Sequence, residues 1–102
     1  MNNPLQPACY ILYSEKLDKF YIGASHEDVN NRLDKHNKHS YGNHRFTAKT
    51  NDWVVFLTID ASDYPHAIRI ERKIKSMKSR KYILNLKKYP ELREKLIIQT
   101  RT

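Results

Sequence analysis

The apolar positions of the chain form short runs that predict three β-strands. Residues 8–13 and 20–24 are rich in strand-favouring side chains, and the polar segment 14–19 between them favours a turn, so the sequence predicts a hairpin. Residues 53–59 are apolar nearly throughout, which is typical of a strand covered on both faces. We therefore expect this third run to be the central strand of the sheet and to anchor the core.

The segment between the second and third runs is predicted to begin as a helix and to continue as a loop. Ser25 can cap a helix, and Glu27 and Asp28 would lie in its first turn, where negative charge complements the helix dipole. We expect this helix to span about residues 27–38. Residues 37–51 are polar and basic without a clean period, which predicts a long, mobile loop.

The C-terminal part of the chain is predicted to be helical. Apolar residues recur at helical spacing from Ala67 to Met77, which predicts an amphipathic helix from residue 64 or 65 to about residue 78. Two further helices are expected, one over about 80–87 and one over about 90–99.

Size and charge narrow the class of protein. A chain of 102 residues falls in the ordinary size range of one domain. Nineteen Lys and Arg against 11 Asp and Glu give a formal net charge of +8, which favours a polyanion such as nucleic acid as the partner. A soluble protein that is merely basic explains the charge equally well.

The sequence has neither a membrane-spanning run nor the features of a secretory signal. No apolar stretch approaches about 20 residues, and the N-terminus lacks a basic segment followed by an apolar one, so we expect a cytoplasmic protein. The single cysteine, Cys9, permits no disulfide within the chain. We expect Cys9 to be a small buried hydrophobe rather than a nucleophile.

Five residues in a particular order suggest a site for chemistry. Tyr10 lies in Cys-Tyr-Ile-Leu and Tyr21 in Phe-Tyr-Ile-Gly, one on each strand of the predicted hairpin, with ten residues between them. Arg32 and His36 follow four residues apart on the first predicted helix, and Glu71 lies on the later helix in Ala-Ile-Arg-Ile-Glu-Arg. In this order and spacing the sequence resembles the GIY-YIG nuclease superfamily.

The resemblance implies both a fold and an activity. It implies an α/β (α+β) fold with a small central three-stranded, mainly antiparallel sheet flanked by helices. We expect one domain over residues 1–102, with its core at about 8–88 and a C-terminal helix at about 90–99. It also implies a metal-dependent endonuclease that hydrolyses phosphodiester bonds in DNA. Because no appended recognition module is expected, we predict low sequence specificity.

Phosphodiester hydrolysis explains why these residue types would be needed. It requires a base, a cationic group on the phosphate and a metal ion. By resemblance, Glu71 would bind one divalent cation, Mg²⁺ or Mn²⁺, and Arg32 would hold the phosphate with its planar guanidinium. Tyr10 is the first choice for the base, with Tyr21 positioning or relaying, and His36 could share the proton transfer. We expect the five side chains to converge around one pocket.

Two of these residues have a plain structural alternative. Without the resemblance, His36 would be expected to be a surface histidine on a polar helix. Glu71 would be expected to form an exposed pair with Lys75, four residues later on the same helix.

Further residues are predicted to extend a surface for nucleic acid. The partner is expected to be duplex or branched DNA, with RNA as an alternative, and the chain is expected to be a monomer or a weak dimer. A non-catalytic nucleic-acid-binding module on the same fold is the second hypothesis, and a domain that binds an acidic protein is the third. The predicted nucleic-acid contacts are Gly23, Lys49, Arg69, Lys75, Lys78 and Asn85.

Overall fold

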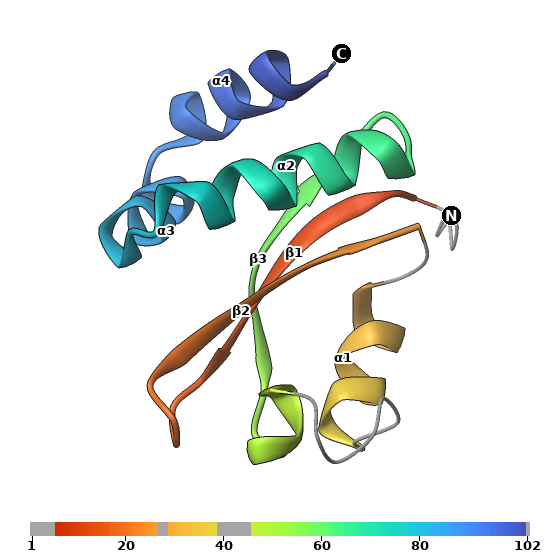
Figure 1. Cartoon of the computed structure of the whole chain (residues 1–102), viewed down its shortest axis with the longest axis vertical. Coiled ribbons are helices and arrows are strands. Elements are labelled where there is room, and N and C mark those ends of the chain that lie inside the picture. The colour runs from red at the N-terminus through yellow and green to blue at the C-terminus, as the bar shows by residue number, and fades with distance from the viewer. Residues whose placement is uncertain (1–5, 27–28, 39–45, 102) are drawn as a thin grey trace.

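The computed structural model describes residues 6–26, 29–38 and 46–101 of the chain. They form an α+β fold in which helices flank one antiparallel sheet, as expected (Figure 1). None of the described helices is long and apolar enough to cross a membrane. The elements are β1 (Ala8–Ser14), β2 (Lys19–Ser25), α1 (Val29–Asn37), the 3₁₀ helix η1 (Phe46–Lys49), β3 (Val54–Asp60), α2 (Tyr64–Met77), α3 (Arg80–Lys88) and α4 (Pro90–Thr100).

The central strand of the sheet is β1, not β3. It pairs antiparallel with β2 on one side and with β3 on the other, and residues 8–12 are all buried. The expectation that the third apolar run forms the central strand is therefore wrong, and Val54 at the start of β3 is 55% exposed. An apolar run indicates that both faces of a strand are covered, but it does not distinguish a central strand from an edge strand whose faces are covered by other side chains. Here the Lys87 amine lies 4.5 Å from the centre of the Phe56 ring.

The pairing of β1 with β3 contains one bulge. Leu57 and Val55 lie opposite successive residues of β1, so Phe56 is an extra residue in the ladder. As a result, Phe56 and Leu57 both pack against the core cluster on one face of the sheet, whereas Val55 and Trp53 belong to the cluster on the other face.

Helices cover both faces of the sheet, and the alternation of side chains along β1 separates two clusters (Figure 1). Cys9 and Ile11 point to the face that α2, α3 and α4 cover, and Tyr10 and Leu12 point to the face that α1 and η1 cover. Cys9 is a fully buried small hydrophobe, as predicted, and its burial raises the pKa of the thiol.

The segment between β2 and β3 differs in part from the prediction. Ser25 is the last residue of β2 and lies opposite Ala8 of β1. Its role as the cap of the first helix stays a prediction, because the residues just before Val29 lie outside the described ranges. Glu27 and Asp28, expected in the first helical turn, lie outside the described residues, as do residues 39–45 of the predicted loop. Within the rest of that loop, Phe46–Lys49 forms a short 3₁₀ helix.

Two side chains of α2 fasten the end of α4. The Ser62 N–H donates to Nδ1 of His66 over 3.0 Å, so Nε2 is the protonated nitrogen, and it lies 3.1 Å from the Thr100 hydroxyl. Arg69 donates to the carbonyls of Thr100 and Arg101 over 2.7 and 2.8 Å. The two bonds from Arg69 satisfy carbonyls that a helix end leaves without partners within the helix.

Asp52 joins the hairpin turn to the segment before β3. Its carboxylate accepts hydrogen bonds from the Ser14 hydroxyl at 2.6 Å, the Lys16 N–H at 3.0 Å and the Thr50 hydroxyl at 2.7 Å. The bond from Ser14 is the largest cause that lowers the pKa of Asp52 from 3.8 to about 2.

Asp52→Asn is therefore expected to lower the free energy of unfolding near neutral pH. A carboxyl whose pKa is lower in the folded state stabilises fully above the unfolded value of 3.8 and loses this effect as the pH falls through about 2. The difference between wild type and variant in urea unfolding should shrink over that pH range. Asp34→Asn, on an exposed part of α1, is the control. If the difference in unfolding free energy between wild type and Asp52→Asn does not change with pH, the stabilising role of the Asp52 carboxylate is contradicted.

Candidate active site

Tyr10, Tyr21 and His36 come together on the α1 face of the sheet. Tyr10 is fully buried on β1, and its hydroxyl lies 3.0 Å from Nε2 of His36 on α1. The rings of Tyr21 and His36 are 4.8 Å apart, and those of Tyr10 and Tyr21 are 6.4 Å apart. The structure thus gathers three of the five predicted residues into one cluster of hydroxyl and imidazole groups.

His36 is held between two hydroxyl groups. It is 3% exposed, so the alternative of a surface histidine is excluded. Its Nδ1 lies 2.9 Å from the Thr47 hydroxyl, and the Thr47 carbonyl accepts a bond from the Trp53 indole N–H over 2.8 Å. A hydroxyl can donate or accept, so both tautomers and the charged form of His36 keep both bonds. His36 can therefore take up or release a proton without losing its position.

Arg32 lies on α1 one turn before His36. Residues four apart on a helix share one side of it, so the two side chains lie above one another. Arg32 is half-buried, and its Nε atom is buried. The guanidinium is therefore partly enclosed by the protein next to the tyrosine and histidine cluster.

Gly23 lies directly against the phenol of Tyr10. The two residues are opposite each other in the ladder of β1 and β2, and a Cβ at position 23 would be 2.5 Å from both Cζ and the hydroxyl oxygen of Tyr10. Gly23 is buried within β2, which continues to Ser25. The group that approaches its backbone is the Tyr10 ring.

Gly23→Ala is expected to lower the free energy of unfolding by about 1–3 kcal/mol, the usual cost of overpacking a core. The added methyl group would displace the Tyr10 ring and its bond to His36. Urea unfolding of Gly23→Ala, Tyr10→Leu and the double variant would measure the effect. In the Tyr10→Leu background most of the cost should vanish, since leucine lacks the atoms that clash. An equal cost in both backgrounds would contradict this origin.

Glu71 lies apart from the tyrosine and histidine cluster. Its helix α2 covers the opposite face of the sheet, where the Glu71 charge contributes to the raised pKa of the Cys9 thiol. The side chain is 21% exposed, and its Oε1 lies 3.7 Å from Nζ of Lys75, which is the pair expected as the structural alternative. Convergence of all five residues on one pocket stays a prediction.

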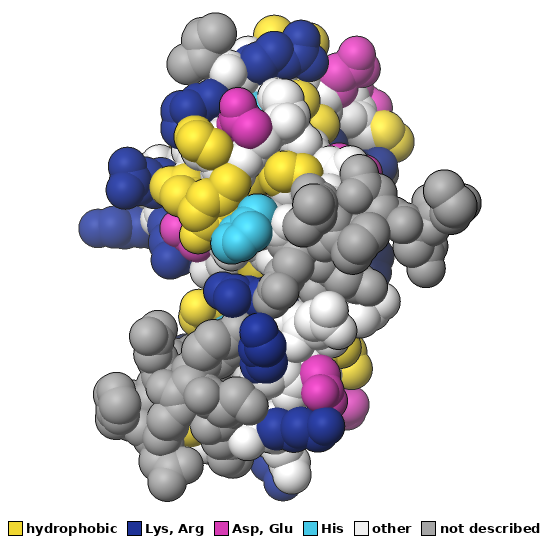
Figure 2. Space-filling model, turned by 90° about the vertical axis from the view of Figure 1, so that its right-hand side faces the viewer, with side chains coloured by type: hydrophobic (Ala, Val, Ile, Leu, Met, Phe, Trp, Pro, Cys, Tyr) yellow, Lys and Arg dark blue, Asp and Glu magenta, His cyan; other side chains and the backbone are white. Residues whose placement is uncertain are grey.

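The residues predicted to contact nucleic acid are spread over several elements. Lys49 is exposed on η1, Asn85 is half-buried on α3, and Arg69 is engaged with the end of α4. Lys75 and Lys78 line a pocket beside β2. Figure 2 shows Lys and Arg side chains distributed over the upper and lower parts of one face rather than gathered in one patch.

Thr47 contacts His36 in this cluster, and it is not among the residues predicted from the sequence. It is buried, and it connects His36 to Trp53 through its hydroxyl and its carbonyl. A threonine in a polar segment gives no signal of such a role. Only the fold, which brings η1 against α1, reveals it.

Comparison with known proteins identifies the family. Neither the curated proteins nor the solved structures contain a significant match to the chain. The model of a family described as the GIY-YIG catalytic domain matches residues 6–88, which include everything from β1 to α3 and all five predicted catalytic residues. Nucleases of this family generally depend on a divalent metal ion. With most of its length matched, the chain belongs to the GIY-YIG family.

Proposed function

We propose that this protein is a divalent-metal-dependent endonuclease that hydrolyses phosphodiester bonds in DNA with low sequence specificity. The observation that carries the proposal is the 3.0 Å contact between the Tyr10 hydroxyl and His36, which joins residues 26 positions apart in a buried cluster beside Tyr21. Membership of the family supports the class of reaction. The net charge of +8 supports a polyanionic substrate.

The burial of the two tyrosines supports different roles for them. Hydrolysis forms a P–O bond to water, breaks the P–O bond to the sugar oxygen, and moves one proton from the water and one to the leaving oxygen. Tyr10 is fully buried, so its hydroxyl is placed to hold His36 rather than to meet the water. Tyr21 is half-buried beside the same imidazole. We therefore assign the substrate-facing role to Tyr21, with His36 as the group that exchanges protons behind it.

The position of β2 supports a location for the scissile phosphate. β2 is an outer strand, with Tyr21 directed to the α1 face and α2 packed over the other face. A phosphate lying across the outer edge of β2 would be approached by Arg32 from one side and Glu71 from the other. The guanidinium would neutralise charge on the phosphoryl oxygens and hold their orientation.

Glu71 fits the role of a protein ligand for one Mg²⁺ or Mn²⁺ ion. Its carboxylate is partly exposed, and the cation beside it, Lys75, makes only a long contact of 3.7 Å. Mg²⁺ commonly takes one or two carboxylates and completes its shell with water and phosphate oxygens. When bound, the ion would supply further charge neutralisation at the phosphate.

A plasmid-nicking assay tests the proposal. Supercoiled plasmid incubated with the purified protein should become open-circular in the presence of Mg²⁺ and stay supercoiled with an excess of chelator. Mapping the nicks should show many unrelated sequences. Binding of the plasmid without nicking, with either Mg²⁺ or Mn²⁺, would favour the alternative of a non-catalytic nucleic-acid-binding module.

A further inference from the structure

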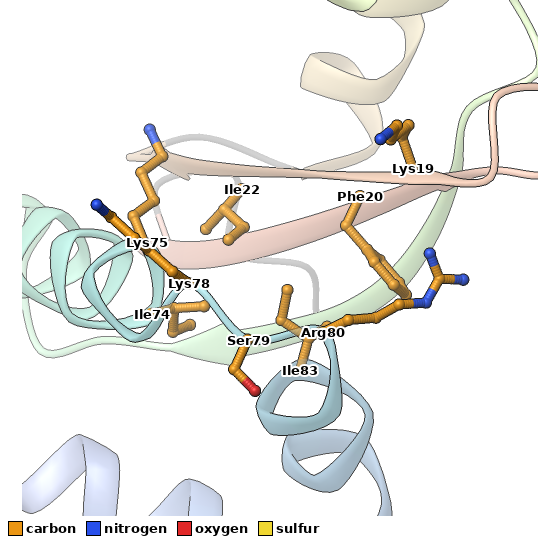
Figure 3. A pocket seen from close by; sticks show the side chains of 9 residues that line it. All are labelled: Lys19, Phe20, Ile22, Ile74, Lys75, Lys78, Ser79, Arg80 and Ile83. Atoms are coloured by element: carbon orange, nitrogen blue, oxygen red, sulfur yellow. The ribbon is translucent and has the colours of Figure 1, made fainter.

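A pocket of about 400 Å³ lies between β2, the end of α2 and the start of α3. It is on the α2 face of the sheet, away from the tyrosine and histidine cluster. Figure 3 shows four apolar side chains directed toward one another in its interior, with basic side chains around them. The apolar side chains are Phe20, Ile22, Ile74 and Ile83, and the basic ones are Lys19, Lys75, Lys78 and Arg80.

The charge around the pocket is positive. Lys75 is paired with Glu71, and Arg80 is paired with Asp18 at 2.6 Å. Lys19 and Lys78 are exposed, and neither forms an ion pair with any residue that the structure describes. The rim therefore offers two cations for a ligand in addition to the two that are already paired.

The side of the pocket formed by Arg80 is held in place. Its guanidinium lies 5.1 Å from the centre of the Phe20 ring and donates to both the carboxylate and the carbonyl of Asp18. The turn between α2 and α3 is also well defined, because Lys78 adopts the left-handed conformation and Ser79 caps α3. An apolar interior with a fixed planar cation at its wall suits a flat ligand that carries negative charge.

We propose that this pocket binds an unpaired nucleotide of the substrate strand, with its base among the isoleucines and its phosphates on Lys19 and Lys78. The proposal rests on the proposed function for the identity of the strand. The pocket adjoins the proposed metal ligand, because Lys75 of its rim lies 3.7 Å from Glu71. A nucleotide held here would therefore be close to the phosphate that is cut.

The chemistry of the pocket favours a nucleotide over an acidic peptide. Its volume lies at the lower end of the range for small-ligand pockets, enough for one ring system and not for a helix. Bases in a continuous duplex are stacked and paired, so only an unpaired or extruded base can enter. The consequence is a preference for DNA with single-stranded or unpaired positions next to the cut.

The test is a binding measurement in chelator, so that nothing is cut. Fluorescence anisotropy at low salt would compare a labelled oligothymidylate with an abasic strand of equal length, which keeps every phosphate and lacks the bases. Wild type should bind the thymidylate at least about fivefold more tightly, because burying the face of one base against apolar side chains contributes at least about that factor. Equal affinity for the two strands, or no binding of the thymidylate, would overturn the proposal.

Protein variants locate the binding. Lys78→Gly removes a cation from the rim while keeping the left-handed conformation that glycine favours. It should weaken thymidylate binding about fivefold or more, whereas Lys95→Ala, on exposed α4, should have a smaller effect. Equal losses of thymidylate affinity in Lys78→Gly and Lys95→Ala would show that the strand does not bind at this pocket. Competition by an acidic peptide of the same charge, at equal concentration, would overturn the choice of ligand.

The outcome is separable from that of the proposed function. If the protein nicks plasmid but binds the two strands with equal affinity, the proposed endonuclease activity holds and the proposed nucleotide site is rejected. If the protein binds the thymidylate more tightly but never nicks plasmid, the proposed nucleotide site holds and the proposed endonuclease activity is rejected.

Discussion

Glu71→Gln is expected to reduce the rate of metal-dependent plasmid nicking by about a hundredfold or more. The amide keeps the size of the side chain and removes the negative charge that would bind the cation. The magnitude is that of losing one group that stabilises charge developing in the transition state. Loss of the contact with Lys75 adds little, because that lysine is exposed and such pairs stabilise weakly.

The matched control for Glu71→Gln is Glu94→Gln, on an exposed position of α4 outside the matched family region. Thermal unfolding of both variants should resemble that of wild type, so that a change in rate cannot be ascribed to lost structure. Raising the Mg²⁺ concentration should restore part of the activity of Glu71→Gln if its defect is in metal affinity. Wild-type rates in Glu71→Gln would remove this residue from the site.

Arg32→Lys is expected to reduce nicking by about a hundredfold as well, although the positive charge is retained. Arginine presents a planar group with parallel N–H donors that match two phosphate oxygens, and lysine presents a single point charge. The position on α1, half-buried beside His36, limits how far a lysine amine could move to compensate. The assay is the rate of plasmid nicking at saturating Mg²⁺.

Arg72→Lys is the companion variant for Arg32→Lys, because Arg72 is exposed on α2 and the exchange is chemically the same. It should nick at close to the wild-type rate. DNA binding in chelator should change little in either variant, since net charge is preserved. Arg32→Lys with full activity would show that a cation alone suffices, and the proposed bidentate contact would have to be abandoned.

Most helices and strands could be predicted because their signals are local. In α2, Asp63 accepts a hydrogen bond from the His66 N–H at the N-terminus, and Pro65 lies in the first turn. Lys78 ends the helix in the left-handed conformation, within a residue of the predicted boundary. The order of the strands could not be predicted in this way, because it depends on pairings between distant segments. The local richness of β3 in apolar residues therefore misled.

The part of the candidate site that lies on the hairpin could be predicted from the sequence, and the positions of the helices around it could not. The hairpin register that places Tyr10 opposite Gly23 also directs Tyr21 to the same face, and this follows from a short loop between two alternating strands. Which face α1 or α2 would cover is not encoded in helical spacing. For that reason the sequence could name Glu71 as a candidate but could not show that its helix lies across the sheet from His36.

The bulge at Phe56 allows β3 to lose one residue without turning over the residues before it. Successive side chains of a regular strand point to opposite faces, whereas here Phe56 and Leu57 lie on one face and Val55 on the other. Deleting Phe56 would restore the regular alternation and keep Val55 opposite Leu12. Trp53 would still point to η1 and donate to the Thr47 carbonyl, while the core on the α2 face would lose the Phe56 ring. The support of His36 therefore tolerates a one-residue deletion at this position of an outer strand.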